Sequence, residues 1–331
     1  MPAPAIGDLD LLLLLKMLAG DELEAAGRSN HHGADPHDLY THHREGGVPI
    51  PELQKLMAGL TFPEQPRWHD DRLWLSDWGT QEVIAVDLEG NSEVVLRGPS
   101  FPLCVDWLPD GRLLLVAARD GRLLSREPDG SLVTYADLNG VSDRPPGNEM
   151  VIDGRGNVYV NGGGFDLSAG EDFAPGMIAM IGSDGSARPV ADDLAFPNGM
   201  HITPDGSTLI VGESYAKRLT AFDIAADGRL SNRRVWADLG DGVPDGICID
   251  AENAVWYSDV PNQRCVRVRE GGEVLETIEL DRGCFACTLG ATDRMTLFMT
   301  ANQWSGPTSM FDKTAGQVLV APAPAPGAGW P

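Results

Sequence analysis

The fold is most apparent in one stretch, Val243-Pro244-Asp245-Gly246-Ile247-Cys248-Ile249-Asp250-Ala251-Glu252-Asn253-Ala254-Val255-Trp256-Tyr257-Ser258-Asp259. A polar residue opens a short apolar strand, an acidic turn follows, and an aromatic-rich second strand ends the stretch. This second strand recurs at intervals of roughly 40 to 50 residues, a period typical of β-propeller blades. Its six copies are Leu73-Trp74-Leu75, Leu113-Leu114-Leu115, Val158-Tyr159-Val160, Leu209-Ile210-Val211, Val255-Trp256-Tyr257 and Thr296-Leu297-Phe298. We therefore predict an all-β protein, a six-bladed β-propeller of four-stranded blades.

The repeat divides the chain of 331 residues into three parts. We predict an N-terminal extension over residues 1–47 that is partly helical or disordered, a propeller over 48–325, and an irregular C-terminal tail over 326–331. Propellers close their ring by combining strands from both chain ends in one blade. Residues 52–60 should therefore share the last blade with residues 317–320, and the Pro/Ala/Gly-rich chain beyond 320 should be irregular.

Composition excludes several classes of partner and site. The formal net charge of -24 at pH 7 repels nucleic acid and anionic membranes, so we expect neither as a partner. Residues 8–26 have helical composition, but their apolar run is too short for a membrane span and lacks the flanks of a signal peptide. These features predict a cytoplasmic protein with five reduced cysteines, of which Cys284 and Cys287, in CxxC spacing, should be buried core residues. The oligomeric state is not predicted.

Six positions lie 10 or 11 residues before the centres of the repeated strands, where the innermost strand of each blade should begin. Because the innermost strands converge at one mouth of the central channel, their leading side chains should meet there. Two carboxylates and two amides, with no histidine or cysteine, suit a hard cation such as Ca²⁺ and leave room for water or substrate. Each residue alone also fits an ordinary turn, but their shared register favours a site. The six positions are Glu64, Leu103, Asn148, Asn198, Asp245 and Ala286.

Four motifs carry a resemblance to a known family. They are similar to the Glu-Gly-Pro, Asn-Asp, Asn-Gly and Pro-Asp-Gly motifs of the gluconolactonase family, which includes regucalcin and luciferin-regenerating enzyme. The resemblance runs from about residue 48 to 325. The motifs are Phe62-Pro63-Glu64-Gln65-Pro66-Arg67-Trp68, Asn148-Glu149, Phe196-Pro197-Asn198-Gly199-Met200 with Thr203-Pro204-Asp205-Gly206, and Pro244-Asp245-Gly246-Ile247-Cys248-Ile249-Asp250.

This resemblance implies a hydrolase of sugar lactones or related esters with one divalent cation in the channel mouth. Ca²⁺ is the first expectation, and Zn²⁺, Mn²⁺ or Mg²⁺ are alternatives. By matching motif, Glu64, Asn198 and Asp245 would bind the metal, and Asn148 would be a fourth ligand or a substrate contact.

Two positions depart from the family pattern. Gln65 stands where the family has glycine. The family's Arg-x-Asn-Asp becomes Arg144-Pro145-Pro146-Gly147-Asn148-Glu149, with a different arginine spacing and Glu149 in place of aspartate. Arg144 is accordingly a candidate for substrate binding, with Asn148.

The residue inventory favours metal-assisted hydrolysis. The cation would polarise a lactone carbonyl and stabilise the oxyanion that develops as water adds. Because Ca²⁺ lowers the pKa of bound water far less than Zn²⁺ does, a carboxylate is needed as general base, with Asp245 the first candidate and Glu149 the second. A Ser-His-Asp triad is disfavoured, because His69 and His201, the histidines of the predicted propeller, have no evident serine partner.

Two other functions fit the same pattern. One is a phosphotriesterase of the diisopropylfluorophosphatase type acting at the same metal site. The other is a non-catalytic propeller that serves as a binding scaffold, since fold alone does not determine function. The glycine-rich loop at 161–176 would act as a lid over a small-molecule substrate, or would be a mobile surface loop.

Overall fold

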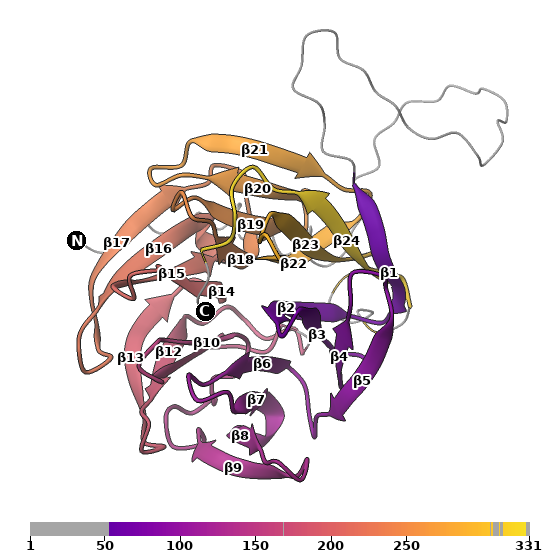
Figure 1. Cartoon of the computed structure of the whole chain (residues 1–331). Coiled ribbons are helices and arrows are strands. Elements are labelled where there is room, and N and C mark those ends of the chain that lie inside the picture. Colours follow the sequence, from indigo (N-terminus) through magenta and orange to yellow (C-terminus); the bar gives the residue numbers. More distant parts are fainter. Residues whose placement is uncertain (1–52, 168, 305, 307–310, 312–313, 329–331) are drawn as a thin grey trace, which may run out of the picture.

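The computed structural model describes residues 53–167, 169–304, 306, 311 and 314–328. Six four-stranded antiparallel sheets stand around a central axis as the blades of a propeller (Figure 1). The predicted all-β architecture of six four-stranded blades is therefore confirmed. The extension predicted over residues 1–47 lies outside the described residues. Within the described ranges, no helix is long and apolar enough to cross a membrane.

Five blades consist of consecutive strands, ordered from the channel outwards. The first two contain β2 (Pro63–His69), β3 (Arg72–Asp77), β4 (Glu82–Val86) and β5 (Ser92–Arg97), then β6 (Leu103–Trp107), β7 (Leu113–Ala117), β8 (Arg122–Arg126) and β9 (Leu132–Asp137). The third and fourth contain β10 (Met150–Ile152), β11 (Val158–Gly162), β12 (Gly176–Ile181) and β13 (Ala187–Leu194), then β14 (Pro197–Ile202), β15 (Thr208–Glu213), β16 (Arg218–Ile224) and β17 (Leu230–Asp238). The fifth contains β18 (Pro244–Ile249), β19 (Val255–Asp259), β20 (Arg264–Val268) and β21 (Val274–Glu279). Two short 3₁₀ turns, η1 (Ala118–Asp120) and η2 (Ser214–Ala216), follow β7 and β15.

The sixth blade closes the ring with strands from both ends of the chain. It combines β22 (Gly283–Gly290), β23 (Thr296–Asn302) and β24 (Gly316–Pro322) with β1 (Gln54–Leu60) as its outer strand. Gln54 of β1 lies opposite Val320 of β24, so the predicted closure is confirmed (Figure 1).

The chain beyond residue 320 is more ordered than we expected. Strand β24 continues through Ala321 to Pro322, which lies opposite Thr296 of β23. The end of a strand tolerates proline, because its missing backbone N–H is not needed for the sheet there. Further on, Gly327 forms an isolated bridge with Asp250. The prediction of irregular structure from residue 321 was therefore wrong for these positions.

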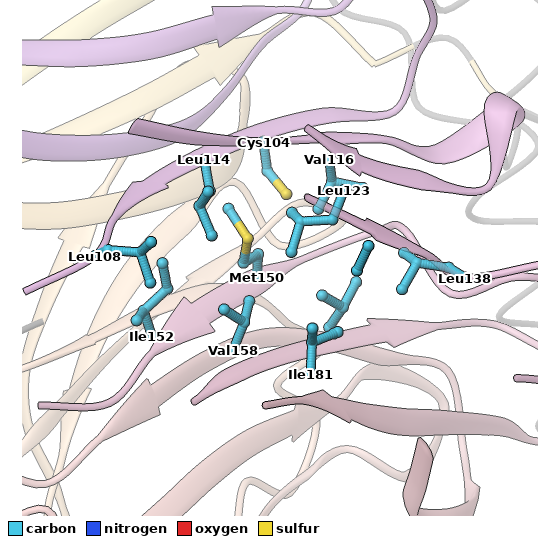
Figure 2. Close-up of a cluster of buried hydrophobic side chains, with 12 residues drawn as sticks. Cys104, Leu108, Leu114, Val116, Leu123, Leu138, Met150, Ile152, Val158 and Ile181 are labelled. Atoms are coloured by element: carbon cyan, nitrogen blue, oxygen red, sulfur yellow. The ribbon is translucent and has the colours of Figure 1, made fainter. Parts of the chain in front are cut away.

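The blades are held together by apolar side chains packed between neighbouring sheets. Figure 2 shows one such cluster, in which Leu114 and Val116 of the second blade face Met150 and Val158 of the third. All four are fully buried, and each such side chain contributes about 1.5–3 kcal/mol by leaving water. The five cysteines, Cys104 in this cluster among them, are free and buried, and burial was predicted for Cys284 and Cys287. This packing holds the inner strands rigidly around the channel.

Candidate active site

A cavity of about 130 Å³ lies at one mouth of the central channel. Its lining includes all four predicted ligands: Glu64 from β2, Asn148, Asn198 from β14 and Asp245 from β18. Asn148 lies just before β10 and not within it, so the innermost strand of the third blade begins later than the sequence predicted. The structure thus brings the four side chains together from four different blades.

Bulges in the inner strands explain how the side chains reach the mouth. The register of β2 shifts directly after Glu64, and the shifts in β14 and β18 enclose Asn198 and Asp245. A β-bulge bends its strand and re-aims the local side chain, and bulges are frequent beside active sites. The candidate ligands therefore face the cavity instead of the apolar layers between the blades.

The residue after each of these three ligands occupies a restricted backbone position. A Cβ atom on Gly199 would lie 2.4 Å from the backbone nitrogen of Ile247, and one on Gly246 would lie 2.4 Å from the Cβ of Ala286. Gln65 has the corresponding position in β2 and adopts a left-handed φ of 55°, a conformation that glycine reaches at lower cost. The glycine of the related motif is therefore explained by backbone geometry, and Gln65 tolerates the same conformation with strain.

Hydrogen bonds from neighbouring residues orient the amide ligands. The Nδ2 group of Asn148 donates to Oδ1 of Asn198 at 3.4 Å, and the side chain of Asn161 donates to the backbone oxygen of Asn198 at 2.6 Å. Nδ2 of Asn198 in turn donates to Oγ of Ser214, whose hydroxyl donates to the backbone oxygen of Pro244 at 2.7 Å. The network links the loops of three blades and fixes the floor of the cavity.

Within the described ranges, the two carboxylates of the floor have no positively charged partner. Burial, then the charges of Asp245 and Glu149, raise the pKa of Glu64 well above its ordinary value. Burial and the charge of Glu149 also raise the pKa of Asp245, although a hydrogen bond from Asn198 opposes this. Ionising both carboxylates is therefore unfavourable, because no basic side chain in the described part of the chain offsets their charge.

Glu149, the second candidate base, lies outside the lining of this cavity. Its Oε1 accepts a hydrogen bond from the Arg67 guanidinium at 2.8 Å, and the same Arg67 nitrogen donates to the backbone oxygen of Met150. Burial raises the pKa of Glu149, and the charge of Arg67 opposes that shift. Glu149 and Arg67 thus form a buried ion pair beside the floor.

Arg144, the predicted substrate contact, is not brought to the cavity. Its side chain is exposed on the surface and forms an ion pair with Glu171 at 2.6 Å. The described lining of the cavity does not include it.

The loop after β11 forms part of the cavity wall. Leu167 lines the cavity, and Phe165 and Phe173 pack with Tyr215 in a buried apolar cluster. A Cβ on Gly164 would lie 2.2 Å from the carbonyl oxygen of Pro175, so this glycine permits a close backbone contact. Whether the loop opens and closes as a lid stays a prediction.

The sequence analysis missed the aromatic walls above the floor. Phe62 and Phe196 line the cavity, and each lies two residues before a candidate ligand, as Val243 does. A signal for them was present in the recurrence itself, because an apolar residue stands two positions before three of the four candidate ligands. Trp78, Tyr215 and Trp304 complete the walls from segments with no such pattern.

In the described part of the chain, no three histidine, cysteine, aspartate or glutamate side chains gather so that they could hold a metal ion. The candidate set has only two carboxylates, Glu64 and Asp245. A cation at this floor would therefore depend on the amide oxygens of Asn148 and Asn198.

Comparison with known proteins gives relatives of several activities. Regucalcin of Danio rerio is 26% identical over 255 residues, covering 74% of this chain and 78% of that protein. Pentonolactonase XacC of Haloferax volcanii is 25% identical over 242 residues, covering 65% and 79%. Diisopropyl-fluorophosphatase of Loligo vulgaris is 27% identical over 192 residues, covering 52% of this chain and 61% of that enzyme.

Solved structures share the propeller fold. A luciferin-regenerating enzyme aligns with a TM-score of 0.72 at 18% identity, over 84% of this chain and 97% of that one. The gluconolactonase XC5397 from Xanthomonas campestris aligns with a TM-score of 0.67 at 24% identity, over 82% and 89%. Residues 62–303, which include all four candidate ligands, match the model of the SMP-30/Gluconolactonase/LRE-like region. The chain belongs to this SMP-30/gluconolactonase/LRE-like family.

Proposed function

We propose that the chain is a divalent-metal-dependent lactonase. The observation that carries this proposal is the convergence of Glu64, Asn148, Asn198 and Asp245 on the floor of one cavity. Lactonases among the relatives, such as the pentonolactonase of Haloferax volcanii, support the same reaction class. Ca²⁺ is the first ion to test, followed by Zn²⁺, Mn²⁺ and Mg²⁺.

The donor set and its charge fit a hard divalent cation. Carboxylate and amide oxygens are the ligands that such ions prefer. When ionised, Glu64, Asp245 and Glu149 carry three negative charges, and Arg67 offsets one of them. Two uncompensated charges in a buried site are costly, and a divalent cation would balance them.

Bound at this floor, the cation would act as a Lewis acid toward the lactone carbonyl. Glu64 and Asp245 would hold it with the two asparagines, and the hydrogen bonds around Asn198 keep those amides oriented. Asp245 is the better candidate for the base that takes a proton from water, because it is partly exposed to the cavity. Glu149 is the weaker candidate, because Arg67 already occupies its carboxylate.

Hydrolysis of a lactone panel, measured with and without chelator, tests the proposal. We expect chelator-sensitive turnover that one of the four ions restores and that Glu64→Ala and Asp245→Ala variants lose while staying folded. Asp223→Asn, an exposed carboxylate on β16, is the matched control and should retain activity. Turnover that is indifferent to chelation would overturn the metal-dependent mechanism.

The similarity to the fluorophosphatase of Loligo vulgaris supports a second candidate function, that of a phosphotriesterase acting at the same four residues. A diisopropyl fluorophosphate substrate belongs in the same panel. Turnover of this compound without any lactone hydrolysis would favour the second candidate. A folded protein that binds no ion and hydrolyses neither class would favour the scaffold alternative.

A further inference from the structure

The walls of the candidate site are almost entirely apolar. On one side, Phe62 packs edge-on against Phe285 with ring centroids 4.8 Å apart, and Trp304 packs against Phe285 at 5.7 Å. On the other side, Phe196 and Tyr215 stack with centroids 4.9 Å apart. The two aromatic groups face a shared cavity, whose polar lining side chains are concentrated at the floor.

Above the floor, the described lining offers few groups that could bind hydroxyls. It contains no lysine, arginine or histidine, and the Ser214 hydroxyl already donates to the backbone oxygen of Pro244. Among the described lining residues, three buried polar side-chain atoms have no hydrogen-bond partner: Oε1 of Gln65 beside the floor, and the Tyr215 hydroxyl and Trp304 indole nitrogen in the walls. Arg144, the cation expected to bind substrate, pairs with Glu171 elsewhere.

From this contrast, we infer that the substrate carries a small alkyl or aryl group beside its lactone or ester bond, and not a ring of hydroxyls. The inference rests on the proposed lactonase function and specifies its substrate class. Hydroxyls buried against these walls without partners would each reduce kcat/KM by about tenfold to a hundredfold.

The size of the cavity limits the apolar group to about one ring. An apolar cavity of about 150 Å³ accommodates benzene, and the cavity here measures about 130 Å³. The apolar group beside the lactone bond is therefore limited to a short alkyl chain or a single aromatic ring.

Paired substrates with the same reacting bond test the inference. The metal-loaded full chain is assayed with δ-valerolactone, δ-hexalactone and dihydrocoumarin against glucono-δ-lactone, with spontaneous hydrolysis subtracted. We expect kcat/KM to be at least tenfold higher for the apolar lactones. A kcat/KM for glucono-δ-lactone equal to or above theirs overturns the inference and leaves the lactonase function intact.

Isosteric wall variants link the preference to this cavity. Val243→Thr and Val260→Thr each add one hydroxyl to the lining at nearly constant volume, and should reduce the preference for apolar lactones by about threefold to tenfold. Val235→Thr makes the same change at an exposed position on β17 and should leave it unaltered. If neither wall variant changes the preference for apolar lactones, the specificity comes from another part of the protein.

A binding measurement separates failure of the inference from failure of the function. δ-Valerolactam and glucono-δ-lactam are amide analogues of the two lactone types, and Trp78 and Trp304 in the lining supply a fluorescence signal for their binding. Tighter binding of δ-valerolactam supports the apolar class even if no lactone is hydrolysed, in which case only the proposed function fails. Equal or tighter binding of glucono-δ-lactam contradicts the inference whatever the turnover.

Discussion

Two buried glutamates of the propeller have opposite surroundings. Glu64 at the channel mouth and Glu213 at the end of β15 are 5% and 0% exposed. Glu213 lies opposite Pro197, the residue before the candidate ligand Asn198. Burial acts to raise the pKa of both carboxyl groups, so the opposite directions of their pKa shifts come from their partners.

Glu213 is fully compensated by the fold. Its carboxylate pairs with Arg218 at 2.9 Å and with Arg233 at 3.3 Å, and it accepts hydrogen bonds from the backbone of Ala195 and the hydroxyl of Thr220. Burial acts to raise the pKa of Glu213, but these partners outweigh it and hold the pKa below its ordinary value.

Glu64 has the reverse arrangement. Among the described residues, no ion pair joins Glu64 or Asp245 to a basic side chain. Besides burial, the charges of Asp245 and Glu149 raise the pKa of Glu64. Burial and the charges of Glu149 and Asp259 likewise raise the pKa of Asp245. The comparison teaches that the protein neutralises a carboxylate that serves the fold and leaves uncompensated those that would serve a ligand.

The largest expected effect is on catalysis at the uncompensated carboxylates. Asp245→Asn keeps an oxygen ligand but removes the base, and should lower kcat by about 10²–10⁴-fold with metal still bound. Turnover rates and metal content of the purified variant check this together. Wild-type kcat in a metal-loaded Asp245→Asn protein would exclude Asp245 as the base.

Stability should respond in opposite ways at the two glutamates. Glu213→Gln weakens two ion pairs within a buried network and should cost roughly 2–4 kcal/mol of unfolding free energy. Glu64→Gln removes a repelling charge and should leave the metal-free protein as stable or more stable. Urea denaturation of both metal-free variants measures their unfolding free energies. Equal losses of unfolding free energy would contradict the difference between the two glutamates.

In the metal-free protein, the contributions of Glu213 and Glu64 to stability should depend on pH in opposite ways. The lowered pKa of Glu213 means that its contribution is present above the unfolded pKa of about 4.3 and is lost as pH falls through the folded value. The raised pKa of Glu64 means that its contribution is full below about pH 4.3 and is lost as pH rises through the folded value. Between pH 4 and 8, the Tm of wild type should therefore fall relative to Glu64→Gln as pH rises. A constant Tm difference across this range would show that Glu64 is not strained by its neighbours.

The smallest effect should come from an exposed charge. Arg144 and Glu171 are each more than two-fifths exposed, and such surface pairs contribute at most about 1 kcal/mol. Arg144→Ala should change KM by less than about threefold and leave unfolding almost unaltered. A tenfold rise in KM would show that Arg144 reaches the substrate after all.

Much of the fold could be predicted because its information is local and repeated. The recurring strands predicted the number of blades. Counting back 10 or 11 residues from the centre of each repeated strand placed Glu64, Asn148, Asn198 and Asp245 at equivalent positions. Equivalent positions in a closed ring must converge, so the sequence predicted their meeting without any contact information.

The environment of those residues could not be predicted in the same way. Arg67 and Glu149 are 82 residues apart in the chain yet form a buried ion pair, and no local pattern links them. Arg144, only four residues before Asn148, pairs with Glu171 on the surface, and no local pattern indicated that partner.

The sequence by itself determined the propeller, its closure and the chemical types of the candidate ligands, since periodicity and residue identity are properties of the chain. Only the tertiary structure decided that the carboxylates of Glu64 and Asp245 have no basic partner among the residues it describes, and that aromatic walls line the cavity above them. Those properties depend on distances between side chains from different blades. Such distances exist only once the ring has closed and its bulges have turned the side chains toward the mouth.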